Sequence, residues 1–252
     1  RRTADDAYRF ARGDTITHPS GFDMTIAGGP LDFYTVTDHA EYLGILPAMN
    51  TPGTELSELP RAKDMFSTDP GRITAAFQGV GASVRSGKVI AEMHDTDVMD
   101  SVWMQNVAAA DRHYVPGEFT TFAAYEYTSV AANEEQGSFA GGNLHRNVFF
   151  KGDAPDRAFS TLDSTNPEDL WDWMDAKRAE GYESIAIPHN PNVSDGLMFR
   201  LQTYNGDPLD AAYAEQRMRN EPLVEVTQVK GTSETHPALS PNDEWADFEI
   251  YD

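Results

Sequence analysis

An acid and an imidazole stand side by side at the end of one apolar run in this sequence. In "PLDFYTVTDHAEYLG", residues 30–44, the run at 31–36 ends in Thr37-Asp38-His39. Its leucine, aromatic and β-branched residues predict a buried strand. Because ligands and catalytic groups of α/β proteins gather beyond the carboxyl ends of strands, we interpret Asp38 and His39 as site residues.

Titratable residues recur at the ends of further predicted strands: Glu126 in "AYEYTS", His145 near the start of "NLHRNVFF", His189 in "IPHN", and Glu234 with His236 in "GTSETH". The chain has no cysteine. Imidazole and carboxylate ligands without thiolates suit Zn²⁺, Mn²⁺ or Fe²⁺. The sequence therefore predicts a divalent metal site whose candidate ligands are His39, Glu126, His145, His189, Glu234 and His236.

Two of these candidates carry a further argument. Glu126 follows "TTFAAY" and His189 follows "SIAIP", so both side chains are expected to be shielded from water. A buried carboxylate needs either a cation or hydrogen bonds to offset its desolvation. The other histidines, His18, His94 and His113, lie in polar or helical contexts and receive no role.

Helix-like and strand-like segments alternate along the chain. Periodicity and end signals predict helices over 4–13, 97–113, 166–181 and 207–220, and strands over 31–36, 117–129, 144–150, 182–190 and 223–236. Residues 50–70, rich in Pro, Thr and Ser, look like a loop or lid within a single domain spanning 1–252. This order predicts a parallel α/β sheet or barrel with crossover helices.

The charge balance bears on partners. The 252 residues include 41 acidic and 19 basic side chains, a net charge of −22. Such a surface repels nucleic acid and anionic membranes, and no apolar run reaches the roughly 20 residues of a membrane-spanning helix. An acidic, lysine-poor and cysteine-free composition suits an exported or periplasmic bacterial protein, and suits a halophile's cytoplasm nearly as well. Since the chain does not begin with Met, we expect residues upstream of Arg1.

Several common catalytic motifs do not occur. The sequence contains no G-x-S-x-G nucleophile turn, no phosphate loop of the form G-x-x-x-x-G-K-[ST], no dinucleotide-binding G-x-G-x-x-G and no H-E-x-x-H. The glycine cluster "GVGAS" at 79–83 is interpreted as a turn. Serine hydrolase, nucleotide-binding and zincin protease readings are therefore disfavoured.

The motifs together resemble a known family. "DAYRFARG", "PLDFYTVTDHAEYLG", "PGEFTTFAAYEYTS", "GGNLHRNVFF", "IPHNPNVSDGLMF" and "VEVTQVKGTSE" occur in that order along nearly the whole chain. They resemble the bacterial proteins called domain of unknown function 3604, a group similar to the polymerase-and-histidinol-phosphatase (PHP) superfamily of metal-dependent hydrolases. The resemblance implies an α/β fold with a distorted (β/α)₇ barrel, two or three divalent metals at the strand ends, and hydrolysis of a phosphoester by a metal-bound hydroxide.

The resemblance also assigns roles. The T-D-H motif matches at 37–39, and its His39 is implied to be a ligand, as are His145 and His189. Glu126 matches the acid that bridges metals. Arg146 would suit an anionic ester group, and Asp38 would orient a ligand histidine or carry a proton.

This sequence departs from the pattern of the superfamily at two motifs. The chain has no H-x-H pair, and Glu234-Thr235-His236 is the one candidate for the closing D-x-H, which we expect further downstream. The barrel is therefore expected to be incomplete at one or both ends.

The leading expectation is a phosphoesterase that acts on a small anionic ester. A sulfate ester or phosphonate would suit the same site. An amidohydrolase-like enzyme acting on an amide or lactone, and a domain that binds metal without catalysis, are the alternatives.

Overall fold

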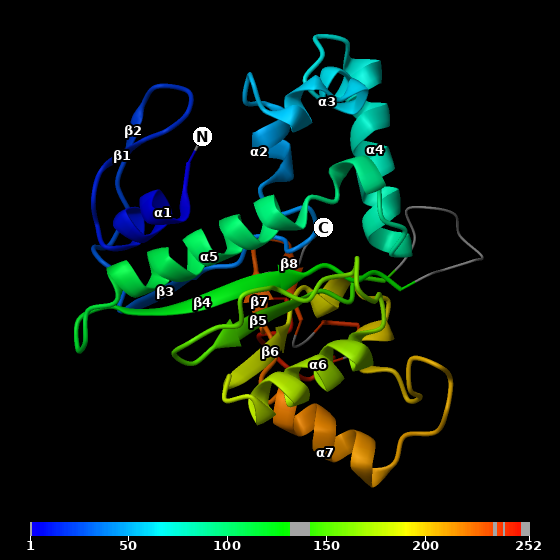
Figure 1. Ribbon diagram of the computed structural model, residues 1–252. Coiled ribbons are helices and arrows are strands. Elements are labelled where there is room, and N and C mark those ends of the chain that lie inside the picture. The colour runs from blue at the N-terminus through cyan, green and yellow to red at the C-terminus, as the bar shows by residue number, and fades with distance from the viewer. Residues whose placement is uncertain (1, 132–141, 234–235, 239, 248–252) are drawn as a thin grey trace.

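A four-stranded mixed sheet forms the centre of the computed structural model, which describes residues 2–131, 142–233, 236–238 and 240–247 (Figure 1). The strands are β3 (Phe33–Val36), β4 (Thr120–Tyr127), β5 (Arg146–Phe150) and β6 (Ser184–Pro188), and this is also their order across the sheet. β3 runs parallel to β4, whereas β5 runs antiparallel to both β4 and β6. Four of the strands predicted from the sequence are therefore confirmed.

The sheet does not close into a barrel. Within the described ranges, β3 and β6 are its two edge strands. Two separate two-stranded ribbons pair β1 (Ile16–Thr17) with β2 (Asp23–Met24), and β7 (Thr227–Gln228) with β8 (Gly231–Thr232). The predicted distorted (β/α)₇ barrel is therefore wrong, because two of the three strand pairs in the main sheet are antiparallel. A strand was predicted over 223–236, and the described part of that range, 223–233, contains the short β7–β8 hairpin instead.

The helices follow the predicted order, and three further α-helices, α2 (Ile45–Met49), α3 (Pro60–Met65) and α4 (Pro70–Ser86), lie between the first and second predicted ones. Those matching predictions are α1 (Ala4–Ala11), α5 (Thr96–His113), α6 (Pro167–Ala179) and α7 (Ala211–Asn220). The 50–70 segment is largely helical, with η1 (Glu55–Glu58) and α3, and it follows α2. The remaining short turns are η2 (Ala91–Met93), η3 (Pro191–Val193) and η4 (Leu197–Phe199).

Local capping explains where helices begin, and corrects one prediction. Asn166 accepts a hydrogen bond from the amide of Glu168 at the start of α6. Asp69 caps α4 (Pro70–Ser86) in the same way, through the amides of Gly71 and Arg72. The "GVGAS" cluster lies inside α4 and is not a turn. The Asp-Pro start and packing against α3 outweigh the low helix propensity of its glycines.

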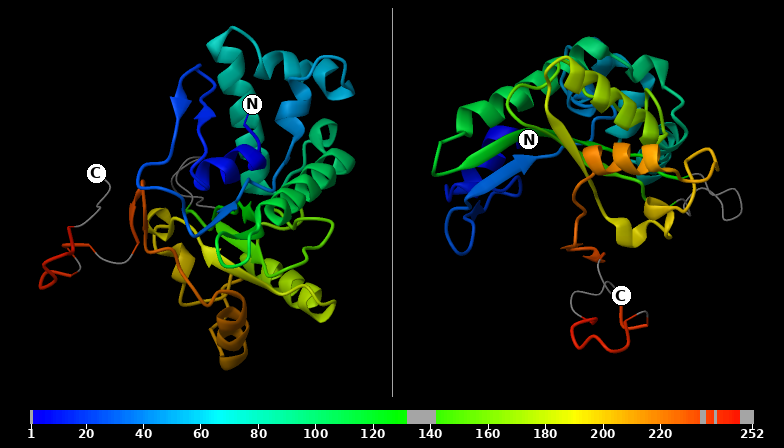
Figure 2. Two further views of the ribbon diagram at one scale, coloured as in Figure 1. Left: turned by 90° about the vertical axis from the view of Figure 1, so that its left-hand side faces the viewer. Right: turned by 90° about the horizontal axis from the view of Figure 1, so that it is seen from below.

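One face of the sheet is covered by helices. Trp103 and Val107 of α5 and Leu170 and Met174 of α6 pack against buried side chains of β4, β5 and β6. Figure 2 shows both helices on the same side of the strands, and α7 beside α6. Since side chains alternate across a strand, every second residue of β3–β6 points to the opposite face. No helix in the described part of the chain is long and apolar enough to cross a membrane.

A buried ion pair fastens α7 to the covered face. Arg146 is 2% exposed and donates from Nε to Glu221 Oε1 over 2.8 Å, and from Nη1 to the carbonyl of Leu144. Trp171 Nε1 donates to the same carboxylate oxygen over 2.8 Å, and Arg217 lies 3.1 Å from Oε2. Glu221 therefore joins β5, α6 and α7 in a region closed to water.

Among the ion pairs of this sheet, the buried Arg146–Glu221 pair should contribute most to the free energy of unfolding. Glu221→Gln leaves the Arg146 guanidinium buried without its counter-charge, and we expect a loss of about 3 kcal/mol in the free energy of unfolding, measured by urea denaturation. Arg219→Gln is the matched control, because it removes a half-exposed partner of Asp175 and should cost much less than Glu221→Gln. Equal losses in the two variants would contradict the structural role of Glu221.

Candidate metal and catalytic site

Three of the predicted histidines lie in a row across one end of the sheet. The ring centroids of His39 and His145 are 6.2 Å apart, and those of His145 and His189 are 6.5 Å apart. We call His39, His145 and His189 the histidine row. They meet although β5 is antiparallel, because His145 precedes its strand whereas His39 and His189 follow theirs. The row lies on the face of the sheet opposite α5 and α6.

Glu126 is the central carboxylate of the row. Its backbone forms a parallel β-bridge with that of His39. His145 Nδ1 lies 2.6 Å from Glu126 Oε1. Its other oxygen, Oε2, lies 3.6 Å from His39 Nδ1. Burial by itself would raise the pKa of Glu126, but the hydrogen bond with His145 and the nearby imidazoles hold that pKa below its ordinary value. The carboxylate is therefore ionised at neutral pH.

His39 is held from a second direction. Its Nδ1 lies 2.6 Å from the hydroxyl oxygen of Thr128, two residues beyond Glu126 on the same side of the extended chain. The His39 side chain is 61% exposed, against 19% for His145 and 19% for His189. His39 is therefore the member of the row that is most open to solvent.

Glu225 is a site residue that the sequence analysis missed. Its Oε2 lies 2.5 Å from His189 Nδ1, and its Oε1 accepts from the amide of Asn190 over 3.1 Å and from Gln228 Nε2 over 2.9 Å. The motif "VEVTQV" contains it, but nothing in that motif indicates a histidine partner 36 residues upstream. The one signal in the sequence was side-chain alternation. Glu225 stands two residues after Leu223 on the same extended segment, so their side chains are expected on the same side.

The ionisation of this pair is coupled. The hydrogen bond that His189 donates to Glu225 raises the pKa of His189, although burial opposes the rise. Burial would raise the pKa of Glu225, but the hydrogen bonds from His189, Gln228 and the amide of Asn190 bring it below its ordinary value. Each partner thus stabilises the charged form of the other.

The three imidazoles form their hydrogen bonds through the same ring nitrogen. All of their bonds to other described residues use Nδ1, which leaves Nε2 without a protein partner in that part of the chain. Histidines that bind metals through one ring nitrogen commonly donate the other to a carboxylate. No group of three or more His, Asp or Glu side chains within the described ranges is placed to hold a metal ion as it stands. The donor types fit a divalent metal, whereas the spacing would need to close around it.

Asp38 and Arg146 lie away from the row. Asp38 Oδ2 accepts from Asn106 Nδ2 of α5 over 3.0 Å, so its side chain points to the covered face of the sheet. Arg146 is next to His145, and alternation along β5 sends it to the same covered face, into the pair with Glu221. The structure brings neither of the two predicted catalytic side chains to the imidazoles.

The last two predicted ligands, Glu234 and His236, come after β8. Glu234 lies outside the described residues. His236 is exposed, and its Nδ1 accepts from the amide of Ala238 over 3.2 Å. Figure 2 shows the described segment after β8 extending away from the sheet.

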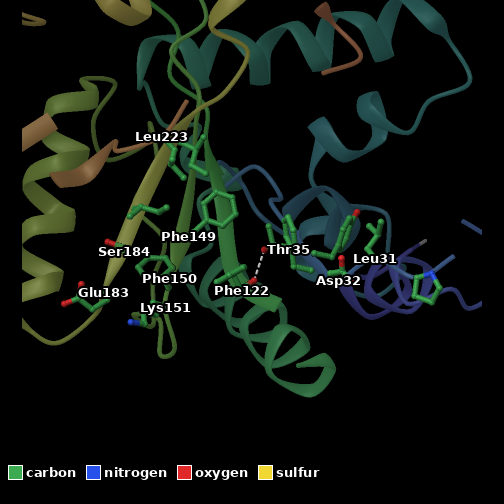
Figure 3. A pocket seen from close by; sticks show the side chains of 15 residues that line it. Leu31, Asp32, Thr35, Phe122, Phe149, Phe150, Lys151, Glu183, Ser184 and Leu223 are labelled. Atoms are coloured by element: carbon green, nitrogen blue, oxygen red, sulfur yellow. Dashed lines mark hydrogen bonds between the residues drawn. The ribbon is translucent and has the colours of Figure 1, made fainter. Parts of the chain in front are cut away.

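An apolar cavity adjoins the row on the same face. It has a volume of about 970 Å³, and its wall includes Phe33, Phe122, Phe149, Ile187 and Leu223 (Figure 3). Ile187 is two residues from His189, and both side chains point to the same face of the sheet. The cavity therefore begins roughly 7 Å from the imidazoles, the length of two residues along a strand. A molecule bound at the row would therefore meet an apolar wall on one side.

Comparison with known proteins places the chain in a family. Residues 1–252 match the model of the family described as "Protein of unknown function (DUF3604)". The chain belongs to the DUF3604 family. No curated protein and no solved structure matches it. The family resemblance drawn from the motifs is confirmed, and the similarity to PHP hydrolases stays a prediction.

The pH dependence of this DUF3604 protein should report the Glu225–His189 pair. In metal-free protein the raised pKa of His189 gives stability that is complete below 6.5 and is lost as pH rises through the raised value. The lowered pKa of Glu225 gives stability that is complete above 4.5 and is lost as pH falls through the lowered value. The contribution is therefore greatest between these two limits.

We expect Glu225→Gln to return the pKa of His189 toward 6.5 and to flatten the unfolding temperature between pH 6 and 8. The pKa is measured by NMR titration of the imidazole C–H signals, with His18, which lies far from the pair in sequence, as the internal control. An unchanged His189 titration in the variant would show that Glu225 does not set it.

Proposed function

We propose that this protein is a metal-dependent hydrolase that acts on a small phosphate ester. The observation that carries the proposal is the histidine row, in which three imidazoles from different strands are anchored through Nδ1 and present Nε2. Two of the anchors are the carboxylates Glu126 and Glu225. Anchoring of this kind fixes the tautomer and raises the basicity of the nitrogen that binds metal.

The donor set suits Zn²⁺, Mn²⁺ or Fe²⁺. The three row histidines would hold the metal through Nε2, and Glu126 would contribute its Oε2 atom. A divalent metal bound there would supply Lewis acidity and lower the pKa of water. Glu126 and Glu225 hold Nδ1 of His145 and His189, and the Thr128 hydroxyl holds Nδ1 of His39, so a bound metal would meet Nε2 of each ring. The DUF3604 match names no activity, so the hydrolytic role rests on this donor geometry and on the motif resemblance to PHP enzymes.

The surroundings of the row support an ester with an organic group. The apolar wall of the adjoining cavity suits the carbon part of such a substrate. Lys230, on the turn between β7 and β8, lies close enough for its positive charge to oppose the rise in the pKa of His189. Because Arg146 is held on the other face, we assign electrostatic attraction of the anionic group to Lys230.

Metal content tests the proposal directly. Elemental mass spectrometry of the purified protein should find Zn, Mn or Fe, and His39→Ala and His189→Ala should each lower the content and abolish hydrolysis of an aryl phosphate. His18→Ala is the matched control, since His18 stacks on Phe22 in the β1–β2 ribbon and should keep both metal and activity. Metal-free parent protein, or loading indifferent to both row variants, would overturn the proposed site.

A substrate panel separates the remaining alternatives. Phosphate esters should be hydrolysed faster than sulfate esters, phosphonates, amides or lactones of the same aryl group. Selective turnover of the amide or lactone would favour an amidohydrolase-like enzyme, and metal binding without turnover of any compound would favour a non-catalytic domain.

Lys230→Gln should raise the KM for the aryl phosphate by up to about fivefold, the effect expected from losing one exposed charge interaction. The KM for an uncharged lactone should not change. Lys88→Gln, which removes a lysine at the end of α4, serves as the control. If both lysine variants behave alike, the assignment to Lys230 fails.

A further inference from the structure

Glu41 is a buried carboxylate that lies behind the histidine row without touching it. It is 8% exposed, and its Oε1 accepts from the amide of Thr128 over 3.1 Å and from the amide of Thr161 over 3.0 Å. Its Oε2 is buried and has no hydrogen-bond partner among the described residues. A buried carboxylate oxygen left unpaired in this way costs stability, so the residue calls for another explanation.

The backbone around β3 explains what Glu41 replaces. The parallel ladder continues past β3 through the bonds from the amide of Glu126 to the carbonyl of Asp38 and from the amide of Ala40 to the carbonyl of Glu126, each 2.9 Å. The chain then turns away toward α2, with Tyr42 at φ 54° and Gly44 at φ 78°. The amide of Thr128 would be next in the ladder, and the Glu41 side chain accepts its hydrogen bond in place of a backbone carbonyl.

Thr128 connects this buried contact to the row. Its backbone is held by Glu41, and its hydroxyl oxygen lies 2.6 Å from His39 Nδ1. Because the threonine side chain has a restricted χ1, fixing its backbone also fixes the hydroxyl. His39 is the most exposed imidazole of the row, and among the described residues the carboxylate at its Nδ1 is that of Glu126, 3.6 Å away, so this hydroxyl is the closer anchor.

We infer that Glu41 is a positioning residue, which acts through Thr128 to hold the His39 imidazole with Nδ1 protonated and Nε2 turned toward the ligand. As far as it concerns metal binding, this inference rests on the proposed function. The orientation of His39 itself does not, and it can be measured in metal-free protein.

The test reads the His39 tautomer by long-range ¹H–¹⁵N NMR in metal-free protein. Thr128→Val removes the hydroxyl and should shift His39 away from the Nδ1–H form, whereas Thr128→Ser should keep it. Glu41→Gln retains an acceptor but lacks the charge that strengthens such hydrogen bonds, so its shift should be in the same direction and smaller. His145 and His189 serve as internal references in every spectrum, and unchanged signals from them show that a variant is folded.

A double-variant cycle separates a positioning role from a purely structural one. If Glu41 acts through Thr128, adding Glu41→Gln to Thr128→Val should move the His39 signals no further. Additive shifts in the double variant would overturn the inference. An unaltered His39 spectrum in Glu41→Gln together with a lowered melting temperature would also overturn it. Glu41 would then be a purely structural contact between two loops.

Metal titration then connects the inference with the proposed function. Thr128→Val should weaken Zn²⁺ binding by about 10- to 100-fold, and Glu41→Gln by a smaller factor that again disappears in the Thr128→Val background. A parent protein that binds no Zn²⁺ would contradict the proposed function, whereas the NMR cycle would still decide the role of Glu41.

Discussion

The alternation of side chains along β5 is the constraint on which both faces of this sheet depend. His145 and Arg146 are adjacent, so they point in opposite directions. His145 joins the imidazoles on the open face, and Arg146 enters the helix-packed face, where it pairs with Glu221 over 2.8 Å. A shift of the strand by one residue would bury the imidazole and expose the guanidinium. The buried pair therefore fixes the register that presents the site.

The same ion pair also determines where the second carboxylate of the site arrives. Glu221 ends α7, and the chain then crosses to β6, where the amide of Glu225 donates to the carbonyl of Pro188 over 3.1 Å. Four residues thus separate a carboxylate that stabilises the core from one that holds an imidazole. The position of His189 in the row is therefore coupled to packing on the other face of the sheet.

Charge is distributed unevenly between the molecule and its site. The chain as a whole carries a net charge of −22, which repels anions at long range. At the row, three imidazoles face two carboxylates, and the charge of Lys230 reaches His189. Capture of an anionic ester would therefore depend on short-range contacts, since the overall field opposes the approach of the substrate. Added salt should weaken that long-range repulsion.

The sequence by itself determined the four strands of the main sheet, four of the helices, and the meeting of His39, Glu126, His145 and His189. Their apolar runs, helix caps and strand-end positions are local signals, and local signals are enough to form strands and to end them at these residues. It did not determine the pairing directions, so the barrel was predicted where the structure has an open mixed sheet. The glycine cluster "GVGAS" was interpreted as a turn, whereas the Asp69 cap and packing against α3 make that segment helical.

Only the tertiary structure decided the partners of these side chains. Arg146 was placed at the site because it is next to a predicted ligand, yet a strand sends neighbours to opposite faces, and the partner that buries Arg146 is 75 residues away. Glu225 and Glu41 were passed over because their contacts with His189 and Thr128 span 36 and 87 residues. Hydrogen bonds of this range are set by how elements pack, and no sequence pattern of a few residues records them.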